Sequence, residues 1–366
     1  MWKDAATPYD QLPAPPPLQE LLDVPVLLKA VSAHAALAEL KGLCLKLLDP
    51  HLLLSTILLQ ESRDSSLIEN IVTTDDQLYK ALVDRLEQAD PAVKEVLNYK
   101  QAVFRGLEHI AAHGAITQGT ALAVVQAVKG DDRGLRERPG TNLANPITRQ
   151  VIYTPPNPAA LPRLLEQWEQ LLNEHVATVP LVRMAMLHYQ FEAIHPFHDG
   201  NGRTGRILNI LYLMHHGLLP QPVLFHSSYI IAHKPAYYQL LREVTENGRW
   251  KPWVLYMLDA VEQTARHTQR LIRDIATLRE ATVVRIRTID PKLPATALAD
   301  LITSLPYVKV GTLEARGFGS RPTATRYLKM LTGDVLRRHP EGRDVYYINQ
   351  RLVDLLARAP QFTGAA

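Results

Sequence analysis

Twelve residues near the middle of the chain, His195 to Arg206, concentrate groups that can do chemistry. The string HPFHDGNGRTGR holds two histidines, a carboxylate, an asparagine, two arginines and three glycines. Gly200 and Gly202 can adopt positive φ, and such a turn points successive backbone N–H groups into a concavity that binds an anion. We expect a helix to begin near Arg203, and its free N-terminal amides and dipole would strengthen this anion cradle.

The charged groups around the cradle suit a polyphosphate. Arg203 and Arg206 are three residues apart, so they would share one helix face. Asp199 is a carboxylate of the kind that holds Mg²⁺ beside phosphates. His195, at the end of the preceding helix, can take a proton from a hydroxyl near neutral pH. Together these groups are the parts needed to transfer a phosphoryl or nucleotidyl group to a hydroxyl.

Two other interpretations of the string have less support. A zinc site at His195, His198 and Asp199 has a workable spacing, but no third strong ligand is evident and the arginines would repel the cation. A plain glycine-rich connecting loop would not produce so long an ordered set of residue types. Phe197 is expected to point into the core and anchor the loop.

The string resembles the signature of the Fic family, His-x-Phe-x-(Asp/Glu)-Gly-Asn-Gly-Arg-x-x-Arg, and every fixed position matches. The resemblance implies a mainly α-helical core that transfers AMP from ATP to a Ser, Thr or Tyr hydroxyl of a protein. It implies His195 as the general base, Asp199 as the Mg²⁺ ligand and Arg206 as the clamp on the γ-phosphate. Related Doc-type kinases carry Lys at the position of Gly202, so this glycine favours AMP transfer. The residues expected to contact ATP are Gly200, Asn201, Gly202, Arg203, Thr204, Gly205 and Arg206, with His198 at a variable position and without a role.

A second polar string, SSLIENIVTT at residues 65–74, places Ser65 and Glu69 four residues apart on one helix face. A solvated helix end with Ser65 as its N-cap is the ordinary interpretation. The string also resembles the Fic inhibitory motif, (Ser/Thr)-x-x-x-Glu-(Gly/Asn), through Ser65, Glu69 and Asn70. That resemblance, which spans roughly residues 1–270, implies that Glu69 pairs with Arg206 and takes the place of the γ-phosphate, so that ATP binds unproductively.

The elements that would position these groups are mostly helical. Apolar residues recur at helical spacing over about 18–48, 52–61, 161–174, 181–194 and 203–216, and a long helix is expected beyond 250. The stretch 131–158 is rich in Gly, Pro and Asn and predicts a small β-hairpin around Thr141–Tyr153. The resemblance places a flap here that holds a target peptide by its strand edge, although a plain surface loop fits equally well. The flap residues would be Thr148, Arg149, Gln150, Val151, Ile152 and Tyr153.

The pair Tyr237 and Tyr238 resembles two tyrosines near the adenosine in family members. Aromatic packing in the core is nearly as well supported. An asparagine on the adenine side in a relative would fall near Thr245 here, with Asn247 close by.

The C-terminal region has a different pattern. Residues 298–331 predict a helix, a turn and a second helix capped by Ser320, and residues 334–349 alternate as a β-hairpin with PEGR at its tip. This order is typical of a winged helix-turn-helix, whose second helix would use Arg326 and Lys329 on phosphates. A protein-binding module of the same shape fits equally well, so the partner is DNA or protein.

Composition sets the outer limits. The chain has 366 residues and a net charge of +3; residues 281–366 hold 13 Lys+Arg and 7 Asp+Glu, a balance of +6, which leaves −3 for the rest. The single cysteine, Cys44, excludes an internal disulfide and fits a buried thiol in the cytoplasm. The N-terminus lacks a signal-peptide pattern and no apolar run reaches the ~20 residues of a membrane span.

The sequence therefore predicts a mainly α protein with three parts: an N-terminal arm and helical region (1–105) with the inhibitory motif at 65–70, a Fic core with a β-hairpin flap (106–265), and a winged helix-turn-helix domain (280–366). The predicted function is an autoinhibited, Mg²⁺-dependent protein adenylyltransferase that uses ATP and forms a homodimer. Two alternatives stay open: removal of AMP from proteins by the same site, and a DNA-binding regulator whose Fic core senses nucleotide.

Overall fold

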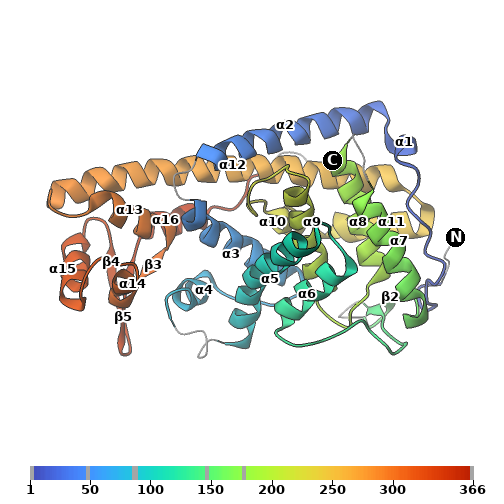
Figure 1. Ribbon diagram of the computed structural model, residues 1–366, viewed down its shortest axis with the longest axis horizontal. Helices are drawn as coiled ribbons and strands as arrows, with labels where there is room; N and C mark the ends of the chain where they lie inside the picture. Colours follow the sequence, from blue (N-terminus) through green and yellow to red (C-terminus); the bar gives the residue numbers. More distant parts are fainter. Residues whose placement is uncertain (1–3, 47–49, 85–89, 145–147, 175–178, 363–366) are drawn as a thin grey trace.

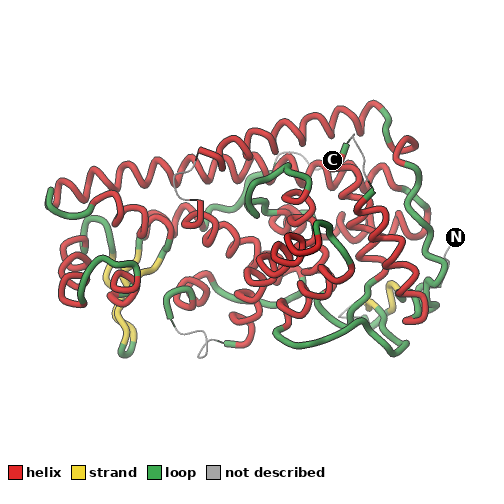
Figure 2. The backbone as a smooth tube through the Cα atoms, viewed as in Figure 1, coloured by secondary structure: helices red, strands yellow, loops and turns green. Residues whose placement is uncertain are grey.

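The computed structural model describes residues 4–46, 50–84, 90–144, 148–174 and 179–362. These residues form a mainly helical molecule with two small antiparallel sheets (Figures 1 and 2). The N-terminal helices are α1 (Leu18–Leu21), α2 (Val24–Lys46), α3 (Pro50–Ile68) and α4 (Asp75–Ala81). The central elements are α5 (Pro91–His113), α6 (Gln118–Lys129), β1 (Leu143–Ala144), β2 (Val151–Tyr153), the 3₁₀ helix η2 (Pro158–Ala160), α7 (Leu161–Asn173), α8 (Pro180–Ile194), α9 (Asn201–His215), α10 (His226–Ala232), α11 (Lys234–Asn247) and α12 (Trp250–Ile289). The C-terminal elements are α13 (Ala295–Ser304), β3 (Tyr307–Val308), α14 (Val310–Ala315), α15 (Arg321–Leu331), β4 (Arg337–Glu341), β5 (Asp344–Ile348) and α16 (Gln350–Leu356).

Helix α9 lies at the centre of the molecule because, from Ile207 to Leu213, every residue except Asn209 is apolar or aromatic and the helix is surrounded by packed elements. Its residues from Arg203 to Leu213 are buried, and α8 and α5 pack against it. Gly106 of α5 allows this close approach, since a Cβ at that position would lie 2.4 Å from Leu211 Cδ1. The start of α9, which carries the signature residues, is therefore held in a fixed place by the core.

Two long helices run along one side of this core (Figure 1). Helix α12 spans 40 residues and packs against α2 over much of its length. Lys29 of α2 donates hydrogen bonds to Asp259 and, at 2.9 Å, to Glu262 Oε2 of α12. Cys44 is buried in the same layer, as expected, and burial raises the pKa of its thiol to about 11.

The N-terminal arm follows the surface of the core as an extended chain. Thr154 Oγ1 donates to the Ala5 carbonyl at 2.7 Å, and Gln190 Nε2 donates to the Pro13 carbonyl at 2.7 Å. Asp10 accepts hydrogen bonds from the backbone N–H and side chain of Asn157. The arm thus braces the segment that follows β2.

The C-terminal region has a hydrophobic core of its own, which includes Leu298, Leu313 and Leu328. Its sheet has the strand order β3-β5-β4, and the β4–β5 hairpin turns at Gly342, within the PEGR tip that the sequence predicts. Helices α13 and α15 lie where the sequence predicts the two helices, but β3 and α14 occupy the segment predicted as a turn. Ser320 is the N-cap of α15 without a side-chain capping bond. Helix α12 continues past residue 280, so one helix serves both cores.

Several boundaries differ from the predicted ones. Helix α3 continues to Ile68 instead of ending near Glu61, so Ser65 lies in its last turn and the N-cap interpretation of Ser65 is wrong. Three of the polar residues in these last turns, Gln60, Glu61 and Ser65, are buried and hydrogen-bonded to partners elsewhere in the fold, which offsets their weak helical periodicity. Helix α9 begins at Asn201 and not near Arg203, and it ends at His216 as its C-cap, followed by Gly217 in the left-handed conformation.

Candidate active site

The loop between α8 and α9 is held by hydrogen bonds within the signature itself. Asn201 is buried; its Oδ1 accepts from the Phe197 backbone N–H at 2.9 Å, and its Nδ2 donates to the Phe197 carbonyl at 2.7 Å. Phe197 is 1% exposed and packs near Phe191, as predicted. The Asn201 side chain therefore shapes the loop, and its backbone N–H is what the head of α9 can offer to an anion.

The two signature glycines act for different reasons. Gly200 is the N-cap of α9 with φ 88°, a conformation that residues with a Cβ rarely adopt. The expectation of a positive φ at Gly202 is wrong, since Gly202 is helical. Glycine is required at position 202 because there is no room for a side chain: a Cβ there would lie 2.2 Å from Glu69 Oε1 and 2.9 Å from Arg206 Nη1. The Glu69 carboxylate therefore lies directly against Gly202, where the sequence predicts the anion cradle.

His195 is the C-cap of α8 and has the left-handed φ of 49°, a conformation that costs energy in a non-glycine residue. Arg136 holds this turn: its Nε donates to the His195 carbonyl at 2.8 Å and its backbone N–H to the Pro196 carbonyl at 3.0 Å. Burial, aided by the nearby Arg136 cation, lowers the pKa of His195 to about 4. The imidazole is therefore neutral at pH 7 and able to accept a proton.

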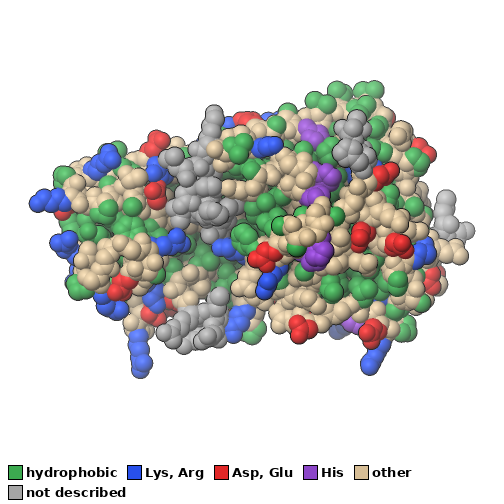
Figure 3. Space-filling view, viewed as in Figure 1, with side chains coloured by type: hydrophobic (Ala, Val, Ile, Leu, Met, Phe, Trp, Pro, Cys, Tyr) green, Lys and Arg blue, Asp and Glu red, His purple; other side chains and the backbone are tan. Residues whose placement is uncertain are grey.

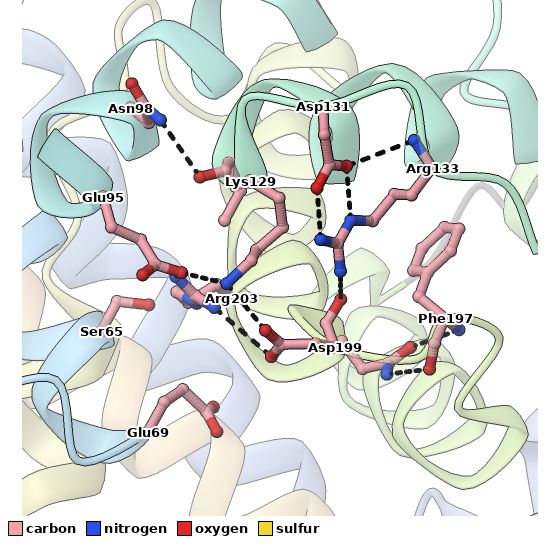
Figure 4. Close-up of polar contacts among 12 residues, drawn as sticks. Ser65, Glu69, Glu95, Asn98, Lys129, Asp131, Arg133, Phe197, Asp199 and Arg203 are labelled. Atoms are coloured by element: carbon pink, nitrogen blue, oxygen red, sulfur yellow. Dashed lines mark hydrogen bonds and ion pairs between the residues drawn. The ribbon is translucent and has the colours of Figure 1, made fainter. Parts of the chain in front are cut away.

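Asp199 lies at the mouth of the cradle, within a cluster of charges (Figure 4). Lys129 Nζ lies 2.7 Å from Asp199 Oδ2 and 2.5 Å from Glu95 Oε1, and Arg203 is paired with Glu95. Burial alone would raise the pKa of Asp199, but the Lys129 ammonium holds it below its ordinary value. The described residues contain no group of three His, Cys, Asp or Glu side chains that could enclose a metal ion.

Arg206 is 1% exposed, and its guanidinium donates to α3 and the turn after it. Its Nε donates to Ser65 Oγ at 2.8 Å, and its Nη2 donates to the Ser65 carbonyl at 2.8 Å and to Glu69 Oε1 at 2.9 Å. Burial alone would lower the pKa of Arg206, but the facing Glu69 carboxylate raises it, so the cation is kept. The pairing of Glu69 with Arg206 that the resemblance implies is present in the structure.

Asn70 ends the segment with a left-handed turn at φ 63°. The Asn70 N–H donates to the Leu67 carbonyl, and the Ile71 N–H donates to the Ser66 carbonyl, both at 3.0 Å. Asparagine and glycine are the residues that adopt this conformation at a helix C-terminus, so the motif's Gly/Asn position has a backbone cause. Lys234 Nζ also donates to the Ile68 carbonyl at 2.8 Å and holds the same helix end.

A cavity of about 620 Å³ opens beside Glu69. Its walls come from the end of α3, the β1–β2 hairpin, α8 and α11, and include Glu69, Ile152, Tyr189, Glu192, Tyr238 and Thr245. Glu192 lines this cavity but was not predicted from the sequence. Burial raises the pKa of its carboxyl to about 7. The size and mixed lining suit a nucleoside with an adjoining peptide segment.

The two tyrosines of α11 have different surroundings. Tyr238 lines the cavity and is 47% exposed. Tyr237 is buried instead, with its hydroxyl 3.0 Å from His188 Nε2 and its ring packed against Trp253. The core interpretation therefore holds for Tyr237. Thr245 lines the cavity, whereas Asn247 is exposed and bonds Glu243.

The predicted hairpin is present as β1 and β2, which pair antiparallel with Leu143 opposite Tyr153. Val151 and Ile152 leave part of β2 accessible beside the cavity, while the Tyr153 hydroxyl donates to the Ala193 carbonyl at 2.7 Å and fixes the strand to α8. Thr148, Arg149 and Gln150 form the exposed turn before β2, and Arg149 has φ 60°. Residues 145–147 of this hairpin lie outside the described part.

Four residues of the site were missed by the sequence analysis: Glu95, Lys129, Arg136 and Glu192. Three lie on helices or a loop far from the signature, and none belongs to a string with a recognisable pattern. Glu192, three residues before His195, could have been found from its helical spacing, which places it one turn from the base.

Comparison with known proteins relates most of the chain to described families. Residues 27–108 match the model "Fic/DOC family N-terminal", residues 108–213 match "Fic/DOC family", and residues 278–352 match "Protein adenylyltransferase SoFic-like, C-terminal domain". Proteins named "Protein adenylyltransferase Fic" from Drosophila erecta and Aedes aegypti are each 37% identical over 114 residues. That alignment covers 31% of this chain but only 22% and 21% of those relatives.

Solved structures show the same fold at low identity. A Fic family protein from Desulfovibrio desulfuricans G20 is 22% identical with a TM-score of 0.58, over 92% of this chain and 98% of that one. A Fic domain containing signaling protein from Bacteroides thetaiotaomicron VPI-5482 is 18% identical with a TM-score of 0.52, over 67% of this chain and 95% of that one.

Proposed function

The chain belongs to the Fic/DOC family, and we propose that it is an autoinhibited protein adenylyltransferase that transfers AMP from ATP to a hydroxyl of a protein. One observation carries the proposal. The neutral His195, the start of α9 at Gly202 and the buried Arg206 all lie close to the Glu69 carboxylate, which itself lines the cavity. Proteins named for this activity are similar to the chain over part of the core.

The reaction follows from these positions. The target hydroxyl oxygen attacks the α-phosphorus of ATP, the new O–P bond forms as the bond to pyrophosphate breaks, and His195 takes the hydroxyl proton. The first backbone N–H groups of α9 and the Arg206 guanidinium would bind phosphate oxygens, once Glu69 no longer occupies that place. Because Arg203 is paired with Glu95, its contribution would come from its backbone and its nearby charge.

Magnesium fits the donor set at the mouth of the cradle. Mg²⁺ commonly uses one or two carboxylates together with substrate phosphates, and Asp199 offers a carboxylate whose side chain is 57% exposed. When bound, the ion would neutralise phosphate charge. Lys129 would have to give up part of its contact with Asp199, since both cations face the same carboxylate.

The β1–β2 hairpin would hold the target. The accessible part of β2 can pair with an extended peptide by backbone hydrogen bonds, which tolerates varied side chains. Ile152 is 46% exposed at the cavity rim and offers an apolar contact for such a peptide.

The proposal extends to the whole chain. The outer face of α2 exposes Val24, Leu28, Val31 and Leu45 at the spacing of a coiled-coil seam, and a second copy of the chain would cover it in a homodimer. Apolar side chains gather at this edge of the molecule in Figure 3. Among the described residues, no helix is long and apolar enough to span a membrane. A cytoplasmic location stays a prediction.

The C-terminal domain has the element order of a winged helix-turn-helix, and Arg326 and Lys329 are exposed on α15. DNA binding by this domain would weaken steeply with salt in mobility-shift assays, because phosphate contacts release counterions. Binding that is insensitive to salt, or no binding, would favour a protein partner.

The test of the reaction uses ATP labelled at either end. The Glu69→Gly variant is expected to place label from α-labelled ATP on protein, and His195→Ala in that background is expected to abolish it. Label arriving from the γ-position would identify a kinase instead. Loss of AMP from a modified protein, without its gain, would identify the reverse activity.

A further inference from the structure

The segment that carries Ser65 and Glu69 is fastened to the C-terminal domain before the inhibitory motif. Thr56 Oγ1 of α3 donates to the Ser304 carbonyl at 2.5 Å, and Gln60 Nε2 donates to the Leu356 carbonyl at 2.7 Å. Thr56 is 1% exposed and Gln60 is 9% exposed, so water does not replace these bonds easily. The C-terminal domain therefore holds α3 just over one turn before Ser65.

The same domain holds the segment after the motif. The Tyr307 hydroxyl donates to Asp76 Oδ1 of α4 at 2.7 Å. Just after α4, Asp84 accepts from the Tyr346 hydroxyl at 2.6 Å and from Lys309 Nζ at 2.8 Å. These partners come from β3, from β5 and from the N-cap of α14, so the sheet of the C-terminal domain faces α4.

Arg63 joins the two fastened parts. Its Nη1 lies 2.5 Å from Asp75 Oδ1 in the first turn of α4, and its Nη2 lies 2.8 Å from Asp64 Oδ1 in α3. The ion pair between Arg63 and Asp75 therefore joins the two helices on either side of the turn from Glu69 to Thr74. Because this ion pair links the two helices, a movement of α4 also moves the end of α3, which Glu69 directly follows.

The side chains of β5 divide between two cores. Tyr346 and Tyr307 belong to the hydrophobic core of the main body, whereas Tyr347, the next residue along β5, belongs to the separate C-terminal core. The alternation follows from the pleat of a strand, which turns successive side chains to opposite faces. One face of β5 thus packs within the domain itself, and the other faces α4 and Asp84, the segment after the motif.

We propose that the C-terminal domain is a working part of the inhibitory switch, with Tyr307 and Tyr346 as the residues that position Glu69 through α4. The inference rests on the proposed function, because it concerns the control of that site. Tyr307 contacts α4 and Tyr346 contacts Asp84 just after it, and neither tyrosine lines the cavity, so they act on the site through Glu69. Whatever free energy their contacts contribute favours the inhibited position of Glu69, and a partner that draws the domain from α4 relieves inhibition.

The test removes only the two hydroxyls. The Tyr307→Phe/Tyr346→Phe double variant keeps both rings in the core and is expected to raise AMP transfer from α-labelled ATP about fivefold or more, the lower end of typical couplings between sites. Tyr347→Phe, on the other face of β5, is the matched control and is expected to leave the rate unchanged. All variants are made in the full chain.

The decisive comparison repeats the double variant with Glu69→Gly. Its effect on the rate should vanish there, because no inhibitory carboxylate is left to position. Backbone amide exchange at Glu69, Asn70 and Ile71 should also be faster in the double variant than in the control. An unchanged rate with Glu69 present, an equal rise without it, or unchanged exchange would overturn the proposal. If Glu69→Gly alone transfers no AMP, the proposed function fails, and the exchange data still decide the coupling.

Discussion

Arg206 is the residue at which substrate binding and inhibition would meet. It is a buried cation, and its hydrogen bonds to Ser65 Oγ, the Ser65 carbonyl and Glu69 Oε1 fix the orientation of its guanidinium. A phosphate that replaced Glu69 would find the guanidinium already oriented by Ser65. Ser65 would therefore serve both the inhibited and the active state, whereas Glu69 belongs to the inhibited one alone.

The protonation of His195 sets an expectation for the pH dependence. Its pKa is lowered to about 4, first by burial and then by Arg136, so the neutral base persists well below pH 6. The group becomes protonated, and activity is lost, only as the pH falls through the folded pKa. The Glu69→Gly variant is expected to show no rate inflection near pH 6.5 that depends on His195. A pH–rate profile that falls with a midpoint near the ordinary histidine pKa would contradict this account.

At this scale the sequence predicts the groups that share a string but not those that support them. His195, Asp199 and Arg206 belong to one pattern, so their proximity follows from their spacing. Lys129 and Arg136 reach the loop from other segments, and only the folded chain brings them there. The tyrosine pair shows a different error: the resemblance places both residues near the adenosine, but Tyr237 is buried in the core and only Tyr238 is exposed at the cavity.

The end of α3 is the element on which the proposed inhibition depends. The chain must leave the helix in the left-handed conformation of Asn70 so that Glu69 reaches Arg206. Lys234 holds the Ile68 carbonyl from α11, on the rim of the cavity. The helix end is thus placed by backbone geometry and by one side chain of a neighbouring helix.

A pair of substitutions at Asn70 tests this geometry. Asn70→Gly keeps the left-handed turn and is expected to leave inhibition intact. Asn70→Val cannot adopt it without a cost of about 1–3 kcal/mol, so Glu69 should be released and AMP transfer should rise. Initial rates with α-labelled ATP give the comparison. Equal rates for the two variants would show that the turn does not position Glu69.

Element types could be predicted more reliably than their ends. The helices with regular apolar spacing are present, and so are both hairpins, because turn residues and alternation are local signals. The length of α3 could not be predicted, since its last turns are polar and are stabilised by contacts with Arg206, Ser227 and Tyr99 from elsewhere in the fold. The start of α9 at Asn201 likewise depends on the bond of its side chain to Phe197.

At the scale of the whole molecule, α12 and the inhibitory segment connect the two cores. Helix α12 packs against α2 and α13, and α3 touches both the signature helix α9 and the C-terminal α13. Lys and Arg side chains gather at the end of the molecule formed by the C-terminal domain (Figure 3). Events at that end can therefore reach Arg206 through packed elements.

The exposed seam of α2 allows the homodimer to be tested separately. Leu28→Glu places a charge in the middle of the apolar face, so it is expected to shift sedimentation toward the monomer. Glu108→Ala, at an exposed ion pair with Arg105 on α5, is the control and should sediment like the unmodified chain. A dimer that persists in the Leu28 variant would place the interface elsewhere.

The central claim is that one carboxylate of this chain blocks its own nucleotide site. Its direct measurement is the initial rate of protein labelling from α-labelled ATP, compared between the unmodified chain and Glu69→Gly under the same conditions. The account predicts a rise of at least about tenfold, corresponding to ~1.4 kcal/mol in favour of the blocked state. Equal rates, with label transferred in both, would contradict it.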